Sequence, residues 1–202
     1  VDPTLTLPVT AHVDAPLTVH GDPKSMSGCT ILNNLGTLLA NLGTFMIKRI
    51  FLHGLDSSGR GTKGTFFSSR CPDMERPDFD GTLQQRMTQL YKLLGEDTFI
   101  AVGSSFGGLM GTVLAVEKPD SVHRLILLAP ALNFHDYQVP DRQIETETIL
   151  VIGKDDVVTP PDIVIPAAEA TFANLQASIV DDDHLLHNTY AGLDWDHLLR
   201  RE

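Results

Sequence analysis

A serine flanked by glycines lies near the middle of the chain, in the segment IAVGSSFGGLMG (residues 100–111). Only Ser105 has a glycine two residues before it and another two residues after it, which is the pattern G-x-S-x-G. The pattern follows an apolar run that is typical of a strand and opens a run that is typical of a helix. In that setting a sharp, strained turn lifts the serine hydroxyl above a sheet, next to a helix N-terminus. We therefore expect Ser105 to be a nucleophile and Ser104 to be a small residue packed beside the turn.

A serine hydroxyl is a poor nucleophile unless a base accepts its proton and a third group orients that base. Candidates for both groups follow later predicted strands. The run ILVIG is followed by KDDVVTPP, which contains Asp155 and Asp156, and the run ASIV is followed by DDDHLLH, which contains His184 and His187. A candidate acid and then a candidate base therefore follow the serine, each directly after a predicted strand.

From residue 46 onward, apolar runs rich in β-branched residues alternate with helical patterns, which indicates a parallel sheet with crossover helices. The sequence predicts strands at residues 47–53, 98–103, 122–130, 147–153 and 176–182, and helices at residues 82–95, 106–118, 161–175 and 190–201. The strands are continuous apolar runs, as expected when helices cover both faces of the sheet. The predicted fold class is therefore α/β, with a mostly parallel central sheet flanked by helices on both faces.

The helix predicted at residues 82–95 illustrates the periodicity. Leu83, Met87, Leu90 and Leu94 recur at spacings of three and four residues, which places them on one face. We expect this face to pack against the sheet and the helix to end at the glycine in position 95.

From residue 47 to the C-terminus, the chain resembles the α/β-hydrolase superfamily, and in particular its compact serine esterases, lipases and thioesterases without a large cap. The resemblance rests on four motifs in the family's order, each after a predicted strand: His53-Gly54, the G-x-S-x-G at Ser105, a G-x-x-D-x-x-x-P at Gly153, Asp156 and Pro160, and Asp183-His184. Ligands of open parallel sheets bind at the edge where the strands have their carboxyl ends.

The resemblance implies a role for each matching residue. Ser105 would be the nucleophile, His184 the general base and then the general acid, and Asp156 the carboxylate that orients the imidazole. The oxyanion hole would consist of the backbone N–H groups of Leu55 and Phe106. No metal ion and no organic cofactor would be needed.

The assigned acid and the assigned base each have a rival. Asp155 is the alternative acid, but only Asp156 has the family's spacing to both the preceding glycine and the following proline. His187 is the alternative base, because a histidine three residues after His184 could face the same cleft.

Other residues whose side chains could do chemistry have simpler interpretations. The carboxylates of residues 181–183 would point in different directions on an extended chain, so a solvated acidic loop is favoured over a metal site. The segment 54–64 lacks the phosphate-loop spacing because Lys63 is followed by Gly64, and we expect a mobile loop beside the active site. His53 is expected to be a structural histidine bonded to nearby backbone.

The first 45 residues have a different pattern. They are expected to form either an edge hairpin plus a helix or a loosely attached extension, ahead of a catalytic domain at residues 46–202. The two cysteines, Cys29 and Cys71, are expected to be free thiols in a reducing compartment, because they form neither a disulfide framework nor a zinc motif.

The composition narrows the function further. A net charge of −11 makes nucleic acid an improbable partner, since an acidic chain repels the phosphate backbone. No membrane-spanning run and no secretory signal occur in the 202 residues, so we expect a cytoplasmic location.

Together these observations predict a serine carboxylesterase that hydrolyses small-molecule esters with short to medium acyl chains. The segment 134–147 lies where larger relatives insert a lid, and it is too short for a substantial cap. A thioesterase acting on acyl thioesters is the nearest alternative, since the scaffold supports both reactions. An alternative of another class is a non-catalytic binding protein that has kept the serine turn.

Overall fold

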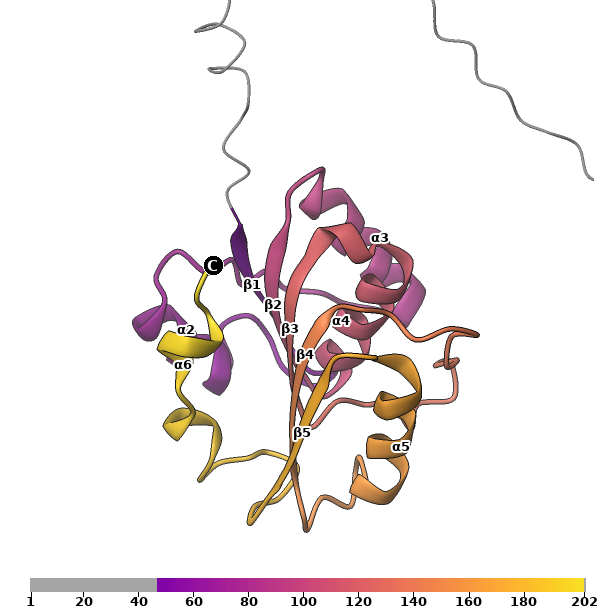
Figure 1. Cartoon of the computed structure of the whole chain (residues 1–202). Coiled ribbons are helices and arrows are strands. Elements are labelled where there is room, and N and C mark those ends of the chain that lie inside the picture. The colour runs from indigo at the N-terminus through magenta and orange to yellow at the C-terminus, as the bar shows by residue number, and fades with distance from the viewer. Residues whose placement is uncertain (1–46, 202) are drawn as a thin grey trace, which may run out of the picture. The chain divides into compact units, whose positions relative to one another are not determined.

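The computed structural model describes residues 47–201 (Figure 1). The strands in this part are β1 (Lys48–Leu52), β2 (Phe99–Ser104), β3 (Val122–Leu128), β4 (Glu147–Gly153) and β5 (Leu175–Val180). The helices are α2 (Thr62–Arg70), α3 (Leu83–Leu94), α4 (Phe106–Glu117), α5 (Pro161–Thr171) and α6 (Trp195–Leu198), with short 3-10 turns η1 (Pro119–Ser121) and η2 (Tyr190–Gly192). The expectation for residues 1–45 lies outside the described residues.

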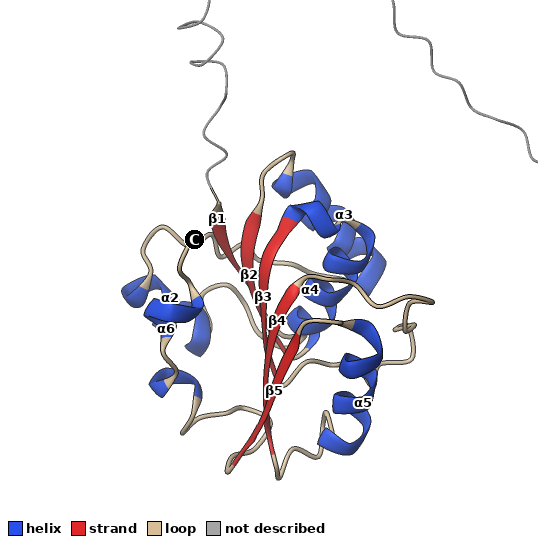
Figure 2. Ribbon diagram, viewed as in Figure 1, coloured by secondary structure: helices blue, strands red, loops and turns tan. Residues whose placement is uncertain are grey.

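The strands form one sheet in the order β1-β2-β3-β4-β5, and every pairing is parallel. Helices α2 and α6 cover one face, and α3, α4 and α5 cover the other (Figure 2). The predicted fold class is confirmed. Because the strands are parallel, their carboxyl ends meet at one edge, where the segments after β1, β2, β4 and β5 carry the candidate site residues.

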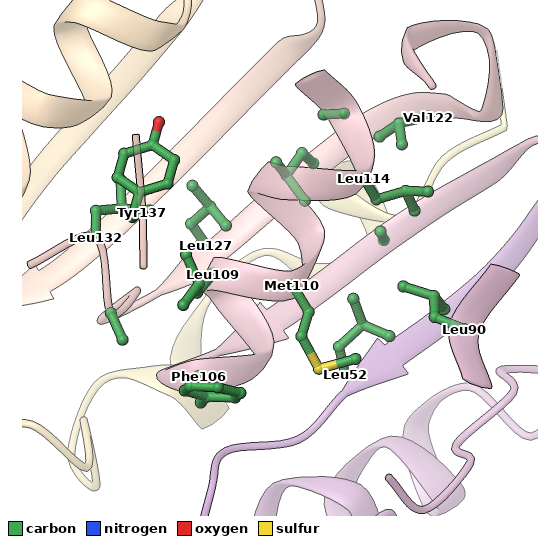
Figure 3. Packing of buried hydrophobic residues seen from close by; sticks show 14 of the residues in the cluster. Leu52, Leu90, Phe106, Leu109, Met110, Leu114, Val122, Leu127, Leu132 and Tyr137 are labelled. Atoms are coloured by element: carbon green, nitrogen blue, oxygen red, sulfur yellow. The ribbon is translucent and has the colours of Figure 1, made fainter. Parts of the chain in front are cut away.

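A buried apolar cluster fills the layer between the sheet and helices α3, α4 and α5 (Figure 3). Helix α4 is apolar nearly all round, and Leu109, Met110 and Leu114 have no exposed surface. Burial of one such side chain contributes roughly 2 kcal/mol. The cluster therefore fixes α4, whose first residue follows Ser105, against the sheet.

Helix α3 follows the predicted pattern closely. Thr82 caps it by accepting from the Gln85 amide, and the Gln85 side chain accepts from the Thr82 amide in return. The helix ends at Gly95, which has a φ of 58° that favours glycine. Met87 and Leu90 are buried, as the periodicity predicted.

Two predicted elements, the last strand and the last helix, differ in the structure. Strand β5 was expected to be covered on both faces, but it is the edge strand, and residues 176–179 are exposed. The C-terminal segment with α6 lies instead at β1 and β3, where Arg49 donates to the Leu199 carbonyl and Arg124 donates to the Leu198 carbonyl. The helix predicted at residues 190–201 is split into η2 and α6, and Asp194 caps the second piece.

The segment 54–64 was expected to be a loop throughout, but helix α2 begins within it at Thr62. The helix forms because tertiary contacts stabilise it. Phe67 is fully buried, with its ring 5.2 Å from that of Phe51 and 4.7 Å from that of Trp195. None of the helices within residues 47–201 is long and apolar enough to cross a lipid bilayer.

Candidate active site

Ser105 lies at a strained turn between β2 and α4. Its φ of 54° and ψ of −118° are uncommon for a residue with a side chain. Hydrogen bonds to the neighbouring strand hold this conformation. The Ser105 amide donates to the Leu128 carbonyl over 2.9 Å, and the Ser105 carbonyl accepts from the Ala131 amide over 3.0 Å. The main chain of β3 and the loop after it therefore fixes the position of the hydroxyl.

The two glycines of the G-x-S-x-G pattern are required by close backbone approaches. A Cβ atom on Gly107 would lie 2.0 Å from the Leu52 carbonyl oxygen, at the end of β1. A Cβ atom on Gly103 would lie 2.5 Å from the Gly107 carbonyl oxygen. The small residues thus allow β1, β2 and α4 to converge beneath Ser105.

A chain of hydrogen bonds joins Ser105, His184 and Asp156. The Ser105 hydroxyl lies 3.0 Å from His184 Nε2, and His184 Nδ1 lies 2.9 Å from Asp156 Oδ2. If the Nδ1–H donates to the carboxylate, Nε2 is left as the acceptor for the serine proton. The structure therefore brings together the three side chains that the sequence pattern singled out, from segments after β2, β4 and β5.

Asp156 is held from both of its oxygens. It is 3% exposed, and Oδ1 accepts from the amides of Val158 and Thr159 over 2.9 and 2.8 Å. The Thr159 hydroxyl donates to Oδ2 over 2.6 Å and lies 3.2 Å from His184 Nδ1. Sequence reasoning missed Thr159, although a threonine three residues after an aspartate is a spacing at which such local bonds form.

The rival residues have other surroundings. Asp155 is exposed, and its amide donates to the Asp182 carbonyl over 3.2 Å. His187 is exposed and lies on the wall of the same cavity as Ser105 and His184. It is the His184 ring that lies between the serine and the buried carboxylate.

Asp182 organises the loop that carries His184. Its Oδ1 accepts from the Asp183 amide over 2.9 Å, and its Oδ2 accepts from the Asn188 and Thr189 amides and the Thr189 hydroxyl. Burial acts to raise the pKa of the Asp182 carboxyl, but these hydrogen bonds outweigh it and hold the pKa below its ordinary value. The expectation of a solvated acidic loop is therefore wrong for Asp182, which is 6% exposed.

Lys63 ties helix α2 to the same loop. Its Nζ donates to the Leu185 carbonyl over 2.7 Å and lies 5.1 Å from the centre of the Tyr190 ring. Burial lowers the pKa of Lys63, while Asp182 and Asp183 act against that shift. The residue lines the cavity, so the segment interpreted as a mobile loop contributes a fixed side chain.

His53 has the structural role that the sequence suggested. It is 1% exposed, its Nδ1–H donates to the Gly54 carbonyl over 2.7 Å, and its Nε2 accepts from the Phe79 amide over 2.8 Å. Burial lowers the pKa of His53, and the charge of Arg86 adds to this effect. The neutral ring therefore fixes the loop after β1.

The backbone at Leu55 and Phe106 adjoins Ser105. A Cβ atom on Gly54 would lie 3.4 Å from the Ser105 Cβ, so the chain after β1 runs next to the serine. Phe106 is the first residue of α4, where an amide has no acceptor within the helix. Within residues 47–201, neither of the two amides donates to another protein group.

A cavity of about 730 Å³ opens beside Ser105 and His184. Its wall is mostly apolar, and the apolar residues that line it include Leu55, Phe106, Phe134, Val158, Leu185 and Tyr190. Phe134 and His135 belong to the segment 134–147, which was expected to be too short for a cap, and they form part of one wall. The Phe134 ring packs edge-on against the Phe106 ring, with 5.2 Å between the ring centres.

The comparisons with known proteins agree with this architecture. A family profile described as the alpha/beta hydrolase fold matches residues 56–147, a stretch that includes Ser105 and ends before Asp156 and His184. No sequence match was found among curated proteins.

Several solved structures share the fold. A hydrolase of the alpha/beta superfamily from Xanthomonas campestris is 21% identical over 71% of this chain and 91% of its own, with a TM-score of 0.60. Est1E from Butyrivibrio proteoclasticus, solved with ferulic acid bound, is 14% identical over 78% and 88%, with a TM-score of 0.61. Mouse alpha/beta hydrolase domain-containing protein 10 is 18% identical over 69% and 82%, with a TM-score of 0.58. The parallel sheet, the serine turn and these similarities together show that the chain has the α/β-hydrolase fold.

Proposed function

We propose that the protein is a serine hydrolase that cleaves carboxylic esters through an acyl-enzyme intermediate on Ser105. The observation that carries the proposal is the continuous hydrogen-bond chain from Ser105 through His184 to Asp156, with the hydroxyl facing a largely apolar cavity. All three groups belong to residues 47–201, which supports residues 46–202 as the catalytic domain.

In the acylation step, Ser105 Oγ attacks the ester carbonyl carbon while His184 Nε2 takes the hydroxyl proton. The carbonyl oxygen gains the negative charge, which the Leu55 and Phe106 amides stabilise by donating to it. Asp156 stabilises the imidazolium. One such backbone donor is typically worth about 3 kcal/mol in the transition state.

The intermediate then collapses, the bond to the alcohol oxygen breaks, and the imidazolium gives its proton to that oxygen. A water molecule next attacks the acyl carbon while His184 accepts its proton. Collapse of this second intermediate releases the carboxylic acid and returns the proton to Ser105.

The cavity supports acyl groups of short to medium length, because its volume is within the range of small-molecule pockets. Its lining offers rings and aliphatic side chains, so a phenolic acid such as the ferulic acid bound to Est1E is one acyl group worth testing alongside straight chains.

The test is hydrolysis of p-nitrophenyl esters with acyl chains of two, four, eight and sixteen carbons. We expect turnover of the shorter chains, and we expect Ser105→Ala to abolish it while the neighbouring Ser104→Ala retains it. Full activity in Ser105→Ala would contradict the proposal. Turnover of an acyl thioester well above that of the matching oxyester would change the substrate class to thioesters.

A further inference from the structure

Arg86 is a buried charge on the otherwise apolar face of α3. It lies one residue before Met87, and it is 4% exposed. Arginine side chains are rarely buried to this extent without an ionic partner. Its presence among core residues is not explained by the packing of α3 against the sheet.

The guanidinium group contacts both residues whose amides are the candidate oxyanion donors. Its Nη2 donates to the Leu55 carbonyl over 3.1 Å, and its central carbon lies 5.2 Å from the centre of the Phe106 ring. Its Nε donates to the Gly81 carbonyl over 3.1 Å, which anchors the group at the start of α3. Phe106 lies at the start of α4 in the core (Figure 3).

This arrangement costs stability. The third nitrogen, Nη1, is buried and has no hydrogen-bond partner within residues 47–201. Burial acts to lower the pKa of Arg86, and Asp80 and Asp56 oppose the shift from a distance without forming an ion pair with it. An arginine nevertheless stays charged. A buried charge with one unsatisfied nitrogen is less favourable than an apolar side chain of similar volume, so stability alone does not account for it.

We propose that Arg86 is the positioning residue of the oxyanion hole. The proposal rests on the proposed function. By holding the Leu55 carbonyl, Arg86 restricts rotation of the backbone at Leu55, and with it the direction of the N–H group. By lying over the Phe106 ring, it fixes the residue whose amide is the second donor. Its positive charge lies close to both donor residues, where it would favour a developing oxyanion.

Arg86 would act through the two amides without touching the substrate, since it does not line the cavity. It should therefore influence the transition state more than substrate binding. A purely structural role would instead change the folded fraction and leave the turnover of the folded protein unaltered.

The first test compares Arg86→Met with Arg86→Lys and with a matched control, Arg124→Met. Arg124 also has a mostly buried guanidinium that donates to backbone carbonyls. It lies near the start of β3, where the strands have their amino ends, away from Ser105. We expect Arg86→Met to lower kcat by about 10- to 100-fold with a change in KM of at most about threefold. Arg124→Met should retain kcat at temperatures where it is folded.

Arg86→Lys keeps the charge but lacks the planar fork that reaches both carbonyls, so its kcat should lie between wild type and Arg86→Met. It also provides a variant that keeps the test decisive if Arg86→Met does not fold.

The second test measures the oxyanion itself. Ser105 Oγ adds to the carbonyl carbon of an alkyl trifluoromethyl ketone, its proton goes to His184, and the former carbonyl oxygen becomes the oxyanion of a stable adduct. The titration of that oxygen is followed by fluorine NMR. We expect it to occur at a higher pH in Arg86→Met than in wild type, with Arg86→Lys in between and Arg124→Met unchanged. An unaltered titration and kcat in both Arg86 variants would overturn the role of Arg86 alone, whereas no adduct in wild type would overturn the proposed function and this role with it.

Discussion

The Nε2 atom of His184 lies 3.0 Å from the Oγ atom of Ser105, although the two residues are 79 positions apart in the chain. The contact exists because β2 and β5 are parallel strands whose carboxyl ends lie at the same edge of the sheet. Each residue is held by its own local network. The main chain around Leu128 and Ala131 holds Ser105, and the Asp182 carboxylate holds the loop of His184.

The role proposed for Asp156, the acid of the proposed triad, can be tested against its neighbour Asp155. Asp156→Asn removes the negative charge beside His184 and weakens the preference for the tautomer with its proton on Nδ1, so kcat for a p-nitrophenyl ester should fall by about 10³- to 10⁴-fold. Asp155→Asn changes an exposed neighbour and should retain turnover within about twofold. Equal losses in the two variants would contradict the assignment of Asp156.

Thr159 is expected to support Asp156. Thr159→Val keeps the shape of the side chain but removes the hydroxyl that donates to Asp156 Oδ2. The loss of one hydrogen bond to a buried carboxylate should lower the free energy of unfolding by about 2 kcal/mol. Because the carboxylate then orients His184 less firmly, we also expect kcat to fall by about tenfold. Steady-state kinetics and urea unfolding measure the two effects. Unchanged kcat would show that the backbone amides alone orient the carboxylate.

Asp182 should make stability depend on pH. Its hydrogen bonds hold the pKa of the folded state below the ordinary value, so the folded protein binds this proton less tightly than the unfolded chain does. The contribution is therefore fully present above the unfolded pKa and is lost as the pH falls through the folded pKa. We expect Asp182→Asn to lower the free energy of unfolding at pH 7 by about 2 kcal/mol. The difference from wild type should shrink at acidic pH.

Urea unfolding at pH 7, 5 and 3 measures this dependence, and Asp181→Asn is the control because Asp181 is exposed. A difference between wild type and Asp182→Asn that stayed constant over this range would contradict the role given to the ionised carboxylate.

Gly107 should tolerate no side chain. In Gly107→Ala the new Cβ would lie 2.0 Å from the Leu52 carbonyl oxygen, so β1 and α4 must separate, and we expect a loss of more than about 3 kcal/mol of stability. Gly192→Ala is the control, because a Cβ there meets nothing within 4 Å. Thermal unfolding separates the two variants, and similar midpoints would show that the turn beneath Ser105 is less constrained than the structure indicates.

Much of the fold could be predicted because its signals are local. Residues close together in the chain determine the strand ends, the periodicity of α3 and the spacing around Ser105 and Asp156. The positions of the candidate triad could therefore be predicted from the sequence. Helix α2 could not be predicted in this way, because the contacts that bury its Phe67, with the rings of Phe51 and Trp195, come from distant parts of the chain.

The roles of Asp182 and Arg86 could not be predicted from the sequence for a related reason. Asp181, Asp182 and Asp183 look alike in the sequence, yet only Asp182 turns inward to the amides of residues 183, 188 and 189. Arg86 contacts Leu55, 31 positions away, and no pattern along the chain indicates such a contact.

The central claim is that Ser105 is the nucleophile, and covalent labelling tests it most directly. The protein is treated with an alkyl fluorophosphonate, its mass is measured intact, and the modified peptide is sequenced by mass spectrometry. The account predicts one adduct, on Ser105, that forms in step with the loss of ester hydrolysis and is absent in Ser105→Ala. Loss of hydrolysis with the adduct on another residue, or hydrolysis that persists when Ser105 is fully modified, would contradict it.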